Sequence, residues 1–556
     1  MSDNTELNRG VGGDNIRTID ENGVKTQVVA LSGQSDAGNL INVPVTPEGH
    51  IEVAIHGPRL PFGSVHTERL HPVFQSDGVY GVNGFSMITA HGLGFGTGAD
   101  SGVVSSSSNL LTVSTGTTQY SFASLQSRRR LRYRAGQGVV GRFTAAFTTP
   151  VASSYQVAGF GTSETTLAFG YNGTSYGILY STGGVRELHT LTITTASTAT
   201  DDYSVTLPNT SSVSVTATNN GSTTQTAYEI SKGTFPGWKA QAIGSTVQFL
   251  RDASGATGGS FSLSQPSAVP PAAGTDATTR AGVSSNDTWI PQSSWNGDVM
   301  DGSGGASNPS GVTLNPLYGN VYQIGVQYLG FGPITFQVEA AFENSNQPDF
   351  VTVHTIKYPN TSSSVSLSQP SFPFLMSAYS AGSVTDLTVK VGSYAGFNEG
   401  ESLNLGPRVS YQRDGMVTSS TSVYTPLFTV RNDLVFASRA NQVVVNLLDV
   451  SGVARGNSTA TTKFYLVRNA ALTGPVNFTQ VGSASACSQD KAATGMSTPS
   501  DSQIVWTRAV TQSGDFEYAF SDREITLQPG ETVTLCIKSL TATADCSGSM
   551  NTREDQ

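Results

Sequence analysis

The feature that most constrains the fold is a regular alternation of short, β-prone segments with turn signals along almost the whole chain. Thr and Val supply β-branched side chains that suit a pleated, half-exposed strand, as in residues 112–121 (TVSTGTTQYS) and 188–200 (LHTLTITTASTAT). The chain has 60 Gly, and Gly and Asn provide the positive-φ positions that join such strands in tight turns. The sequence has no long amphipathic helix and no heptad repeat. It therefore predicts an all-β protein and excludes a coiled-coil stalk.

The length of the chain sets its domain organisation. At roughly 100–200 residues per domain, 556 residues predict about three to five domains. We expect several β-sandwich or jelly-roll-like domains and an extended N-terminal arm. Composition and turn signals divide the chain into an anchoring arm at 1–60, a β domain at 61–186, a small inserted β module at 187–270, a β domain at 271–420 that continues the first, and a C-terminal β-sandwich at 421–556. Within the module, Ala227–Lys232 is expected to form one or two helical turns.

Two hairpins are the most specific local predictions. Asn22-Gly23 lies between the extended runs Ile16–Asp20 and Val24–Leu31, and Asn-Gly is the strongest short-range hairpin signal. In Tyr322–Leu329 and Ile334–Glu339, apolar side chains alternate with polar ones. This alternation predicts two paired strands with one buried and one solvated face.

Charge and cysteine content limit the partners. The formal net charge of −10 argues against a general nucleic-acid binder, which normally has a basic surface, so no nucleic acid is expected. The N-terminal 15 residues lack a basic start followed by an apolar stretch, and no run of 18 apolar residues exists. We therefore expect neither a secretory signal nor membrane insertion. The cysteines Cys487, Cys536 and Cys546 show no disulfide or zinc pattern and are expected to be buried or free thiols.

Two short motifs resemble catalytic or metal-binding signatures. Residues 173–177 match G-x-S-x-G, but a nucleophile elbow needs a strand on one side and a helix on the other, and this motif lies between β-like segments. Residues 298–304 (DVMDGSG) match only part of a calcium loop and lack its flanking helices. The histidines show no metal-ligand spacing. We predict no catalytic residue, no cofactor, no metal site and no enzymatic activity.

The sharpest charge feature is the segment 127–134 (SRRRLRYR). In an extended strand Arg128, Arg130, Arg132 and Arg134 project from one face, and Arg129 projects from the other. Guanidinium groups this close repel one another unless anions oppose them. The pattern predicts either an interface with carboxylates of the same or a neighbouring subunit, or an anion-binding strand for acidic glycans or DNA.

The second candidate site is the tryptophan-rich segment 289–298, in which Trp289, Trp295 and Asp298 form a candidate contact loop. Exposed aromatic rings beside amides and a carboxylate are typical of sugar-binding surfaces, which use ring stacking and hydrogen bonds. A packed loop or a subunit interface is the alternative. The sequence leaves the choice open.

Three stretches resemble proteins of tailed-bacteriophage particles. Residues 12–33 are similar to N-terminal segments of phage structural proteins, residues 227–250 to small β modules of fibre and baseplate proteins, and residues 318–339 to phage and large-virus surface proteins. Together they cover under a quarter of the chain, and they transfer no functional residues.

The resemblance implies a virion structural protein of the tail, baseplate or fibre apparatus. Such a protein would be made in the host cytoplasm, anchored by its N-terminal arm, and in contact with other virion proteins or host-surface glycan. It also implies a homotrimer. The alternatives are a capsid decoration or head-fibre protein and a glycan-cleaving tailspike enzyme.

Overall fold

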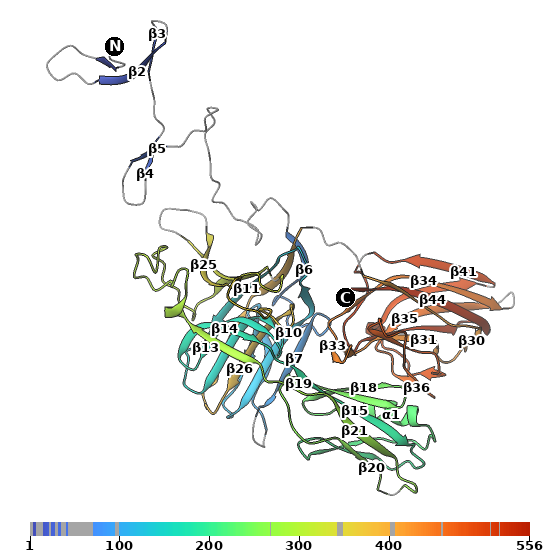
Figure 1. The fold of residues 1–556 in the computed structure, drawn as a ribbon. Helices are drawn as coiled ribbons and strands as arrows, with labels where there is room; N and C mark the ends of the chain where they lie inside the picture. The colour runs from blue at the N-terminus through green and yellow to red at the C-terminus, as the bar shows by residue number, and fades with distance from the viewer. Residues whose placement is uncertain are drawn as a thin grey trace. The chain divides into compact units, whose positions relative to one another are not determined.

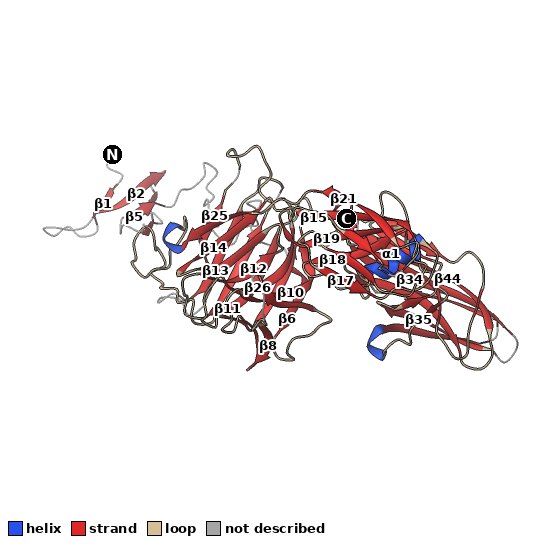
Figure 2. Cartoon of the chain, turned by 90° about the horizontal axis from the view of Figure 1, so that it is seen from below, coloured by secondary structure: helices blue, strands red, loops and turns tan. Residues whose placement is uncertain are grey.

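The structure is a computed structural model in which strands dominate (Figure 2). It describes residues 70–555 except 95–98, 267, 328, 342–347, 358, 401–405, 457–459, 512 and 522; before residue 70 it describes only the backbone of five short strands. The chain divides into two compact units, Met1–Thr67 and Glu68–Gln556. Among the described residues α1 (Thr223–Ser231) is the one α-helix. The all-β class expected from the sequence is confirmed.

The first unit consists of short antiparallel strands, which are β1 (Asn4–Glu6), β2 (Asn15–Glu21), β3 (Val24–Gln27), β4 (Ser32–Gln34) and β5 (Leu40–Asn42). β2 lies between β1 and β3, and β4 pairs with β5. Glu21 pairs with Val24 across a two-residue connection, so the hairpin predicted around Asn-Gly is confirmed. The rest of the predicted arm at 1–60 lies outside the described residues.

The second unit begins with a sandwich of two antiparallel sheets (Figure 1). Its strands are β6 (Leu70–Asp77), β7 (Met87–Leu93), β8 (Val103–Ser107), β9 (Leu110–Ser114), β10 (Ser121–Arg132), β11 (Val139–Phe147), β12 (Ser154–Gly161), β13 (Thr166–Asn172), β14 (Ser175–Thr182), β22 (Asn286–Pro291), β23 (Asn320–Val326), β24 (Ile334–Ala340), β25 (Asp349–Ile356), β26 (Ser371–Ser380), β27 (Thr388–Val391) and β28 (Ser393–Glu399). One sheet has the order β22-β14-β13-β12-β26-β10-β7. The other has the order β25-β24-β23-β11-β27-β9-β8, with β28 paired to both β11 and β6.

Aromatic rings from the two sheets meet in the core of this first sandwich. Phe143 of β11 lies 5.7 Å from Phe160 of β12 and 5.8 Å from Phe374 of β26, measured between ring centroids. Phe169 of β13 lies 4.7 Å from Tyr322 of β23. Such pairs contribute roughly 0.5–1.5 kcal/mol each beyond the burial of their area. The two sheets are therefore joined by specific ring contacts across their inner faces.

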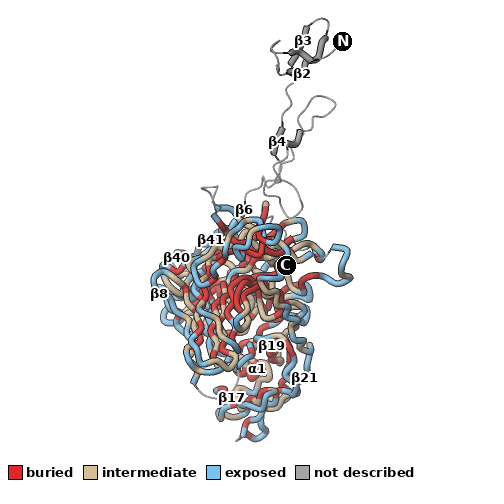
Figure 3. The backbone as a smooth tube through the Cα atoms, turned by 90° about the vertical axis from the view of Figure 1, so that its left-hand side faces the viewer, coloured by how far each residue is buried: buried red, intermediate tan, exposed pale blue. Residues whose placement is uncertain are grey.

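The hairpin predicted in the middle of the chain is confirmed as β23 and β24, which pair antiparallel. Its inward-facing side chains are buried, and they are Tyr322, Ile324, Val326, Ile334, Phe336 and Val338. Tyr328, predicted on the same face, lies outside the described residues. Figure 3 shows buried residues gathered inside the strand layers of the second unit.

The small module is inserted into the first sandwich, because the chain leaves that sheet after β14 and returns to pair with it at β22. Besides α1, its elements are β15 (Arg186–Thr195), β16 (Tyr203–Thr206), β17 (Ser212–Val215), β18 (Trp238–Ile243), β19 (Thr246–Ser254), β20 (Ser262–Ser264) and β21 (Ala273–Arg280). They form the sheets β18-β19-β15-β21 and β17-β16-β20. Since β21 pairs with β15, the module extends past the boundary expected at 270. The short helix expected around Ala227 is present as α1, capped by Ser222.

The C-terminal sandwich has the strands β29 (Arg408–Gln412), β30 (Val417–Thr418), β31 (Thr425–Asn432), β34 (Val444–Gly456), β35 (Thr461–Arg468), β37 (Thr479–Gln480), β38 (Cys487–Asp490), β40 (Ile504–Thr511), β41 (Gly514–Ala519), β42 (Thr526–Leu527), β43 (Thr532–Ser539) and β44 (Ala544–Asp555). One sheet is β29-β44-β34-β41, joined by β30 and β42, and the other is β37-β38-β31-β43-β35-β40. Because β29 pairs with β44, the domain begins before the boundary expected at 421. The three cysteines are buried and free, as predicted.

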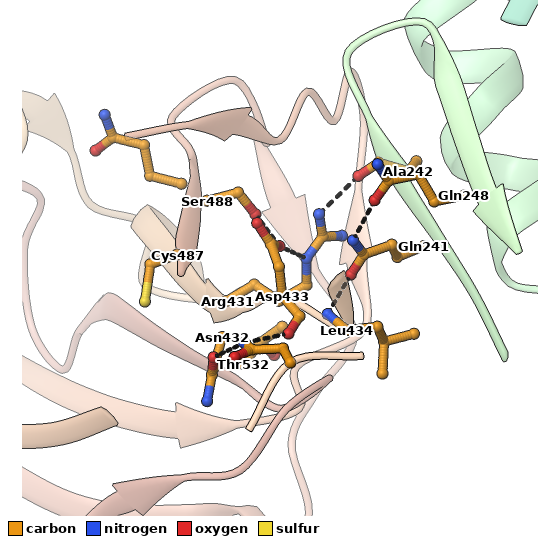
Figure 4. A network of polar contacts seen from close by, with 12 residues as sticks. Gln241, Ala242, Gln248, Arg431, Asn432, Asp433, Leu434, Cys487, Ser488 and Thr532 are labelled. Carbon is orange, nitrogen blue, oxygen red and sulfur yellow. Dashed lines mark hydrogen bonds and ion pairs between the residues drawn. The ribbon is translucent and has the colours of Figure 1, made fainter. Parts of the chain in front are cut away.

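Buried polar contacts fasten the module to the C-terminal sandwich (Figure 4). Arg431 of β31 donates from Nη2 to the backbone oxygen of Ala242, at 2.7 Å, and from Nε to Asp433 Oδ1, at 2.8 Å. The backbone N–H of Leu434 donates to Gln241 Oε1 at 2.6 Å. Arg431 therefore joins the module strand β18 to a carboxylate inside the C-terminal sandwich.

We predict that Arg431→Met destabilises the protein by about 3–5 kcal/mol, because it leaves the carboxylate of Asp433 buried without its charged partner. Asp433 is only 1% exposed. The measurement is the free energy of unfolding from denaturant titration. Arg508→Met, at an exposed position of β40, is the matched control and should leave the unfolding midpoint almost unchanged. Equal losses in the two variants would contradict the role assigned to Arg431.

Candidate functional site

A β-bulge in β10 decides where the arginine-rich segment points its side chains. The pairing of β10 with β26 shifts register between Gln126 and Arg130. Ser127 closes the bulge: its Oγ donates to the backbone oxygen of Arg129 at 2.6 Å and accepts the N–H of Phe374 at 2.9 Å. Bulges re-aim side chains relative to a regular strand. The simple alternation expected for residues 128–134 therefore fails at Arg129, which lines the same pocket as Arg130.

Two of the predicted arginines reach the C-terminal sandwich of the same chain. Arg130 donates from Nη1 to the side-chain oxygen of Gln442. Arg134 donates from Nη2 to both carboxylate oxygens of Asp555, at 2.5 and 2.7 Å. Part of the interface expected for the arginine-rich strand therefore lies within one chain.

Arg128 points in another direction. It donates from Nε to the backbone oxygen of Gly84 at 2.7 Å, and its Nη1 lies 3.6 Å from Glu531 Oε1. Arg468 Nη1 lies 3.7 Å from the same carboxylate oxygen. Two guanidinium groups, one from each sandwich, thus share one carboxylate.

Four arginines of the arginine-rich segment line a pocket between the two sandwiches, called here the arginine pocket. Five arginines line it, Arg129, Arg130, Arg132, Arg134 and Arg523, and Asp555 is the one carboxylate among its described lining residues. Arg130, Arg132 and Arg134 belong to the predicted set. Arg523 was missed, because it lies far along the chain and reaches this place only when the sandwiches dock.

Burial lowers the pKa of three pocket arginines, Arg129, Arg130 and Arg132. Burial lowers the pKa of Arg130 to about 10, with a smaller contribution from Arg186. It also lowers the pKa of Arg129, where Arg523 and Arg468 act in the same direction. For Arg132, burial is the main cause, and Asp555 only partly offsets it. The arginine pocket is therefore strongly cationic in a chain of formal net charge −10.

Two of the three candidate contact residues of the tryptophan-rich segment, Trp295 and Asp298, are buried rather than exposed. Trp295 is buried in the first core, with its ring centroid 6.1 Å from those of Phe169 and Tyr176. Asp298 is only 3% exposed. Trp289 is half-buried on β22. The packed-loop alternative therefore describes Trp295 and Asp298, and these two residues are unavailable to a glycan.

Asp298 organises the loop that follows it. Its Oδ1 accepts the N–H of Met300 at 2.8 Å and the side-chain amide of Asn308 at 3.0 Å, and its Oδ2 accepts the N–H of Ser310 at 2.8 Å. Donors thus occupy both oxygens that a calcium ion would need. Within the described part of the chain, no group of three or more His, Cys, Asp or Glu side chains is placed to hold a metal ion.

The G-x-S-x-G motif at 173–177 forms the turn of a β-hairpin. Asn172 of β13 pairs with Ser175 of β14, and Gly173 takes the positive φ of 57° that the turn requires. A nucleophile elbow needs a helix after the serine, whereas Ser175 begins a strand. The motif is therefore a turn.

A buried histidine between two carboxylates was missed at the sequence level. His189 of β15 is fully buried; its Nδ1 lies 2.8 Å from Asp276 Oδ2, and its Nε2 lies 3.6 Å from Glu187 Oε1. Burial by itself lowers the pKa of His189, but the hydrogen bond and charge of Asp276, with those of Glu187, outweigh it and raise the pKa above its usual value. The three residues stand on paired strands, and only the pairing of β15 with β21 brings Asp276 to the ring.

Comparison with known proteins adds no family to this description. No protein-family model matches the chain, and no curated protein matches it in sequence. Across the residues that the structure describes, helices long and apolar enough to span a membrane are absent.

We predict that Asp298→Ala destabilises the protein by about 2–4 kcal/mol, since it leaves buried donors of the following loop unpaired. The measurement is again the free energy of unfolding. Asp301→Ala, an exposed carboxylate in the same loop, is the control and should change the unfolding midpoint little. If Asp298 were an exposed contact residue, the Asp298→Ala variant would keep the full free energy of unfolding, which would contradict the prediction.

We also predict a pH-dependent contribution from His189. A raised pKa in the folded state means that the stabilisation is complete below the unfolded value of about 6.5 and is lost as the pH rises through the folded pKa. The difference in melting temperature between the wild type and His189→Gln should therefore shrink between about pH 6 and pH 9. His91→Gln, at a largely exposed ring, serves as control. A constant difference across this range would refute the prediction.

Proposed function

We propose that the chain is a virion structural protein of a tailed phage, part of its tail, baseplate or fibre apparatus. The observation that carries the proposal is the division into a small unit of strand pairs, Met1–Thr67, and a large unit with its own hydrophobic cores, Glu68–Gln556. Strand pairs as small as β4 and β5 are marginally stable alone. An assembled particle supplies the partner surface that such a unit needs.

The stretches that resemble phage proteins coincide with structural elements, which supports the same proposal. Residues 12–33 contain the β2–β3 hairpin, residues 227–250 contain β18 and most of α1 and β19, and residues 318–339 contain β23 and most of β24. In this proposal the N-terminal unit anchors the protein in the virion. The large unit contacts other virion proteins or the host surface.

An exposed apolar loop between β6 and β7 suits a contact between subunits or with another virion protein. Tyr80 is 94% exposed and Phe85 is 67% exposed, and Val79 beside them is also exposed. An exposed apolar patch is one mark of an interaction surface. We propose a homotrimer, and native mass spectrometry of the intact chain tests it: a monomer at micromolar concentration would contradict it.

Deletion of residues 1–60 tests the anchoring role. We predict that the shortened chain is not incorporated into assembled particles. The purified variant should unfold at the same temperature as the full chain, because the cores of the large unit remain. Arg508→Gln in the full-length chain is the control and should be incorporated normally. Normal incorporation of the deletion variant would overturn the proposed anchor.

Two alternatives share this architecture. A capsid decoration or head-fibre protein would have the same build at another place in the particle, and a low-resolution map of the virion distinguishes them. A glycan-cleaving tailspike would release reducing sugars from host polysaccharide. Release of sugars by the purified protein would replace the structural proposal with the enzymatic one.

A further inference from the structure

Three arginines of the arginine pocket, Arg129, Arg130 and Arg132, form no ion pair with a carboxylate in the described part of the chain. Four of its arginines come from the segment 129–134 of the first sandwich, and Arg523 comes from the C-terminal sandwich. The one carboxylate among the described lining residues, Asp555, already accepts Arg134 with both oxygens. Arg130 is bonded to a neutral amide, that of Gln442. Guanidinium groups that line one small pocket repel each other unless an anion lies among them.

A second, independent observation is a set of unpaired polar atoms around the same cavity. Asn398 and Asn446 are 4% and 2% exposed and line the pocket, and the side-chain oxygens of both have no hydrogen-bond partner in the described structure. The same holds for Arg132 Nη1 and Gln528 Oε1, which also belong to lining residues. Buried polar groups in folded proteins are nearly always paired. Four unpaired groups around one cavity therefore indicate a polar occupant.

The size of the cavity limits that occupant. Its volume of about 50 Å³ is enough for roughly three or four water molecules. A small tetrahedral ion fits this space. Guanidinium groups bind phosphate oxygens through two parallel N–H donors, which makes arginine the residue best suited to this ligand.

We propose that the arginine pocket binds one inorganic phosphate ion, which bridges the first and the C-terminal sandwich. Arg132 donates to the ion from the first sandwich, and the side-chain amides of Asn446 and Gln528 face it from the C-terminal sandwich. The amides of Asn398 and Asn446 can turn to offer their NH₂ groups, because the two amide orientations occupy almost the same space. The site does not depend on the proposed role in a virion, since it joins two parts of one chain.

The test uses the full-length chain after exhaustive dialysis into chloride buffer. Isothermal titration with phosphate should give a saturable 1:1 signal, and Arg132→Gln should weaken it at least tenfold. Arg508→Gln, which removes an equal charge from an exposed strand position, should bind like the wild type. Absence of binding in the wild type, or equal weakening in both variants, would overturn the proposal.

Melting temperatures supply a readout that does not depend on calorimetric heat. In chloride buffer, Arg132→Gln should melt at or above the wild type, because it relieves repulsion among the arginines. In phosphate at equal ionic strength the order should reverse, because only the wild type gains the ligand. A wild type more stable by the same margin in both buffers would mean that Arg132 acts through ordinary packing, which overturns the proposal.

Two further ligands distinguish the source of the oxyanion. A single-stranded DNA 20-mer presents phosphodiesters, and a sulfated oligosaccharide presents sulfate esters. We expect neither to compete with free phosphate at equal anion concentration. Tighter binding of either polymer than of phosphate would overturn the proposal in favour of a polymer site. A crystal grown in phosphate that shows only water in the pocket would also overturn the proposal.

Discussion

The large unit depends on buried polar contacts between bodies that each have a core of their own. An antiparallel sheet buries one face in its own sandwich. Between the module and the C-terminal sandwich a small apolar cluster, with Leu188 and Leu250 on one side and Val435 and Ala440 on the other, accompanies the polar contacts. Arg431 makes such a polar contact, with Asp433 on one side and a backbone oxygen of β18 on the other. Arg134 and Asp555 do the same between the two sandwiches. Such contacts are directional, and they fix orientation in a way that apolar burial alone does not.

The arginine-rich segment provides some of these contacts, and it carries more positive charge than they pair. Arg128 and Arg134 find carboxylates in the C-terminal sandwich, at Glu531 and Asp555. Arg132 leaves a buried nitrogen without a partner, although it stands on the same strand. A pure interface would match charge for charge, because an unpaired buried guanidinium nitrogen is costly. The unpaired positive charge is the reason why the pocket is better described as a binding site than as a docking surface.

Local sequence patterns predicted the elements well where side chains alternate strictly. The β23–β24 hairpin and the Asn-Gly connection of β2 and β3 followed from period and turn chemistry, which act over a few residues. The patterns failed where a distant strand decided the outcome. The partner of β21 is β15, so the module runs past residue 270. Trp295 was expected in a contact loop but packs against Phe169 and Tyr176, because an aromatic residue in a loop carries no sign of which face will be buried.

The sequence by itself determined the all-β class, the turn positions and an unusual density of arginine between residues 128 and 134. These properties depend on backbone preference and on side-chain type, and both are local. Only the tertiary structure decided that Arg523, Asn398 and Asn446 face those arginines across one cavity. Residues so far apart in the chain meet through strand pairing and sandwich docking, and the free energy of those contacts belongs to the whole fold. The bulge held by Ser127 lies at Arg129, which lines the same pocket as Arg130, and no alternation rule could predict this.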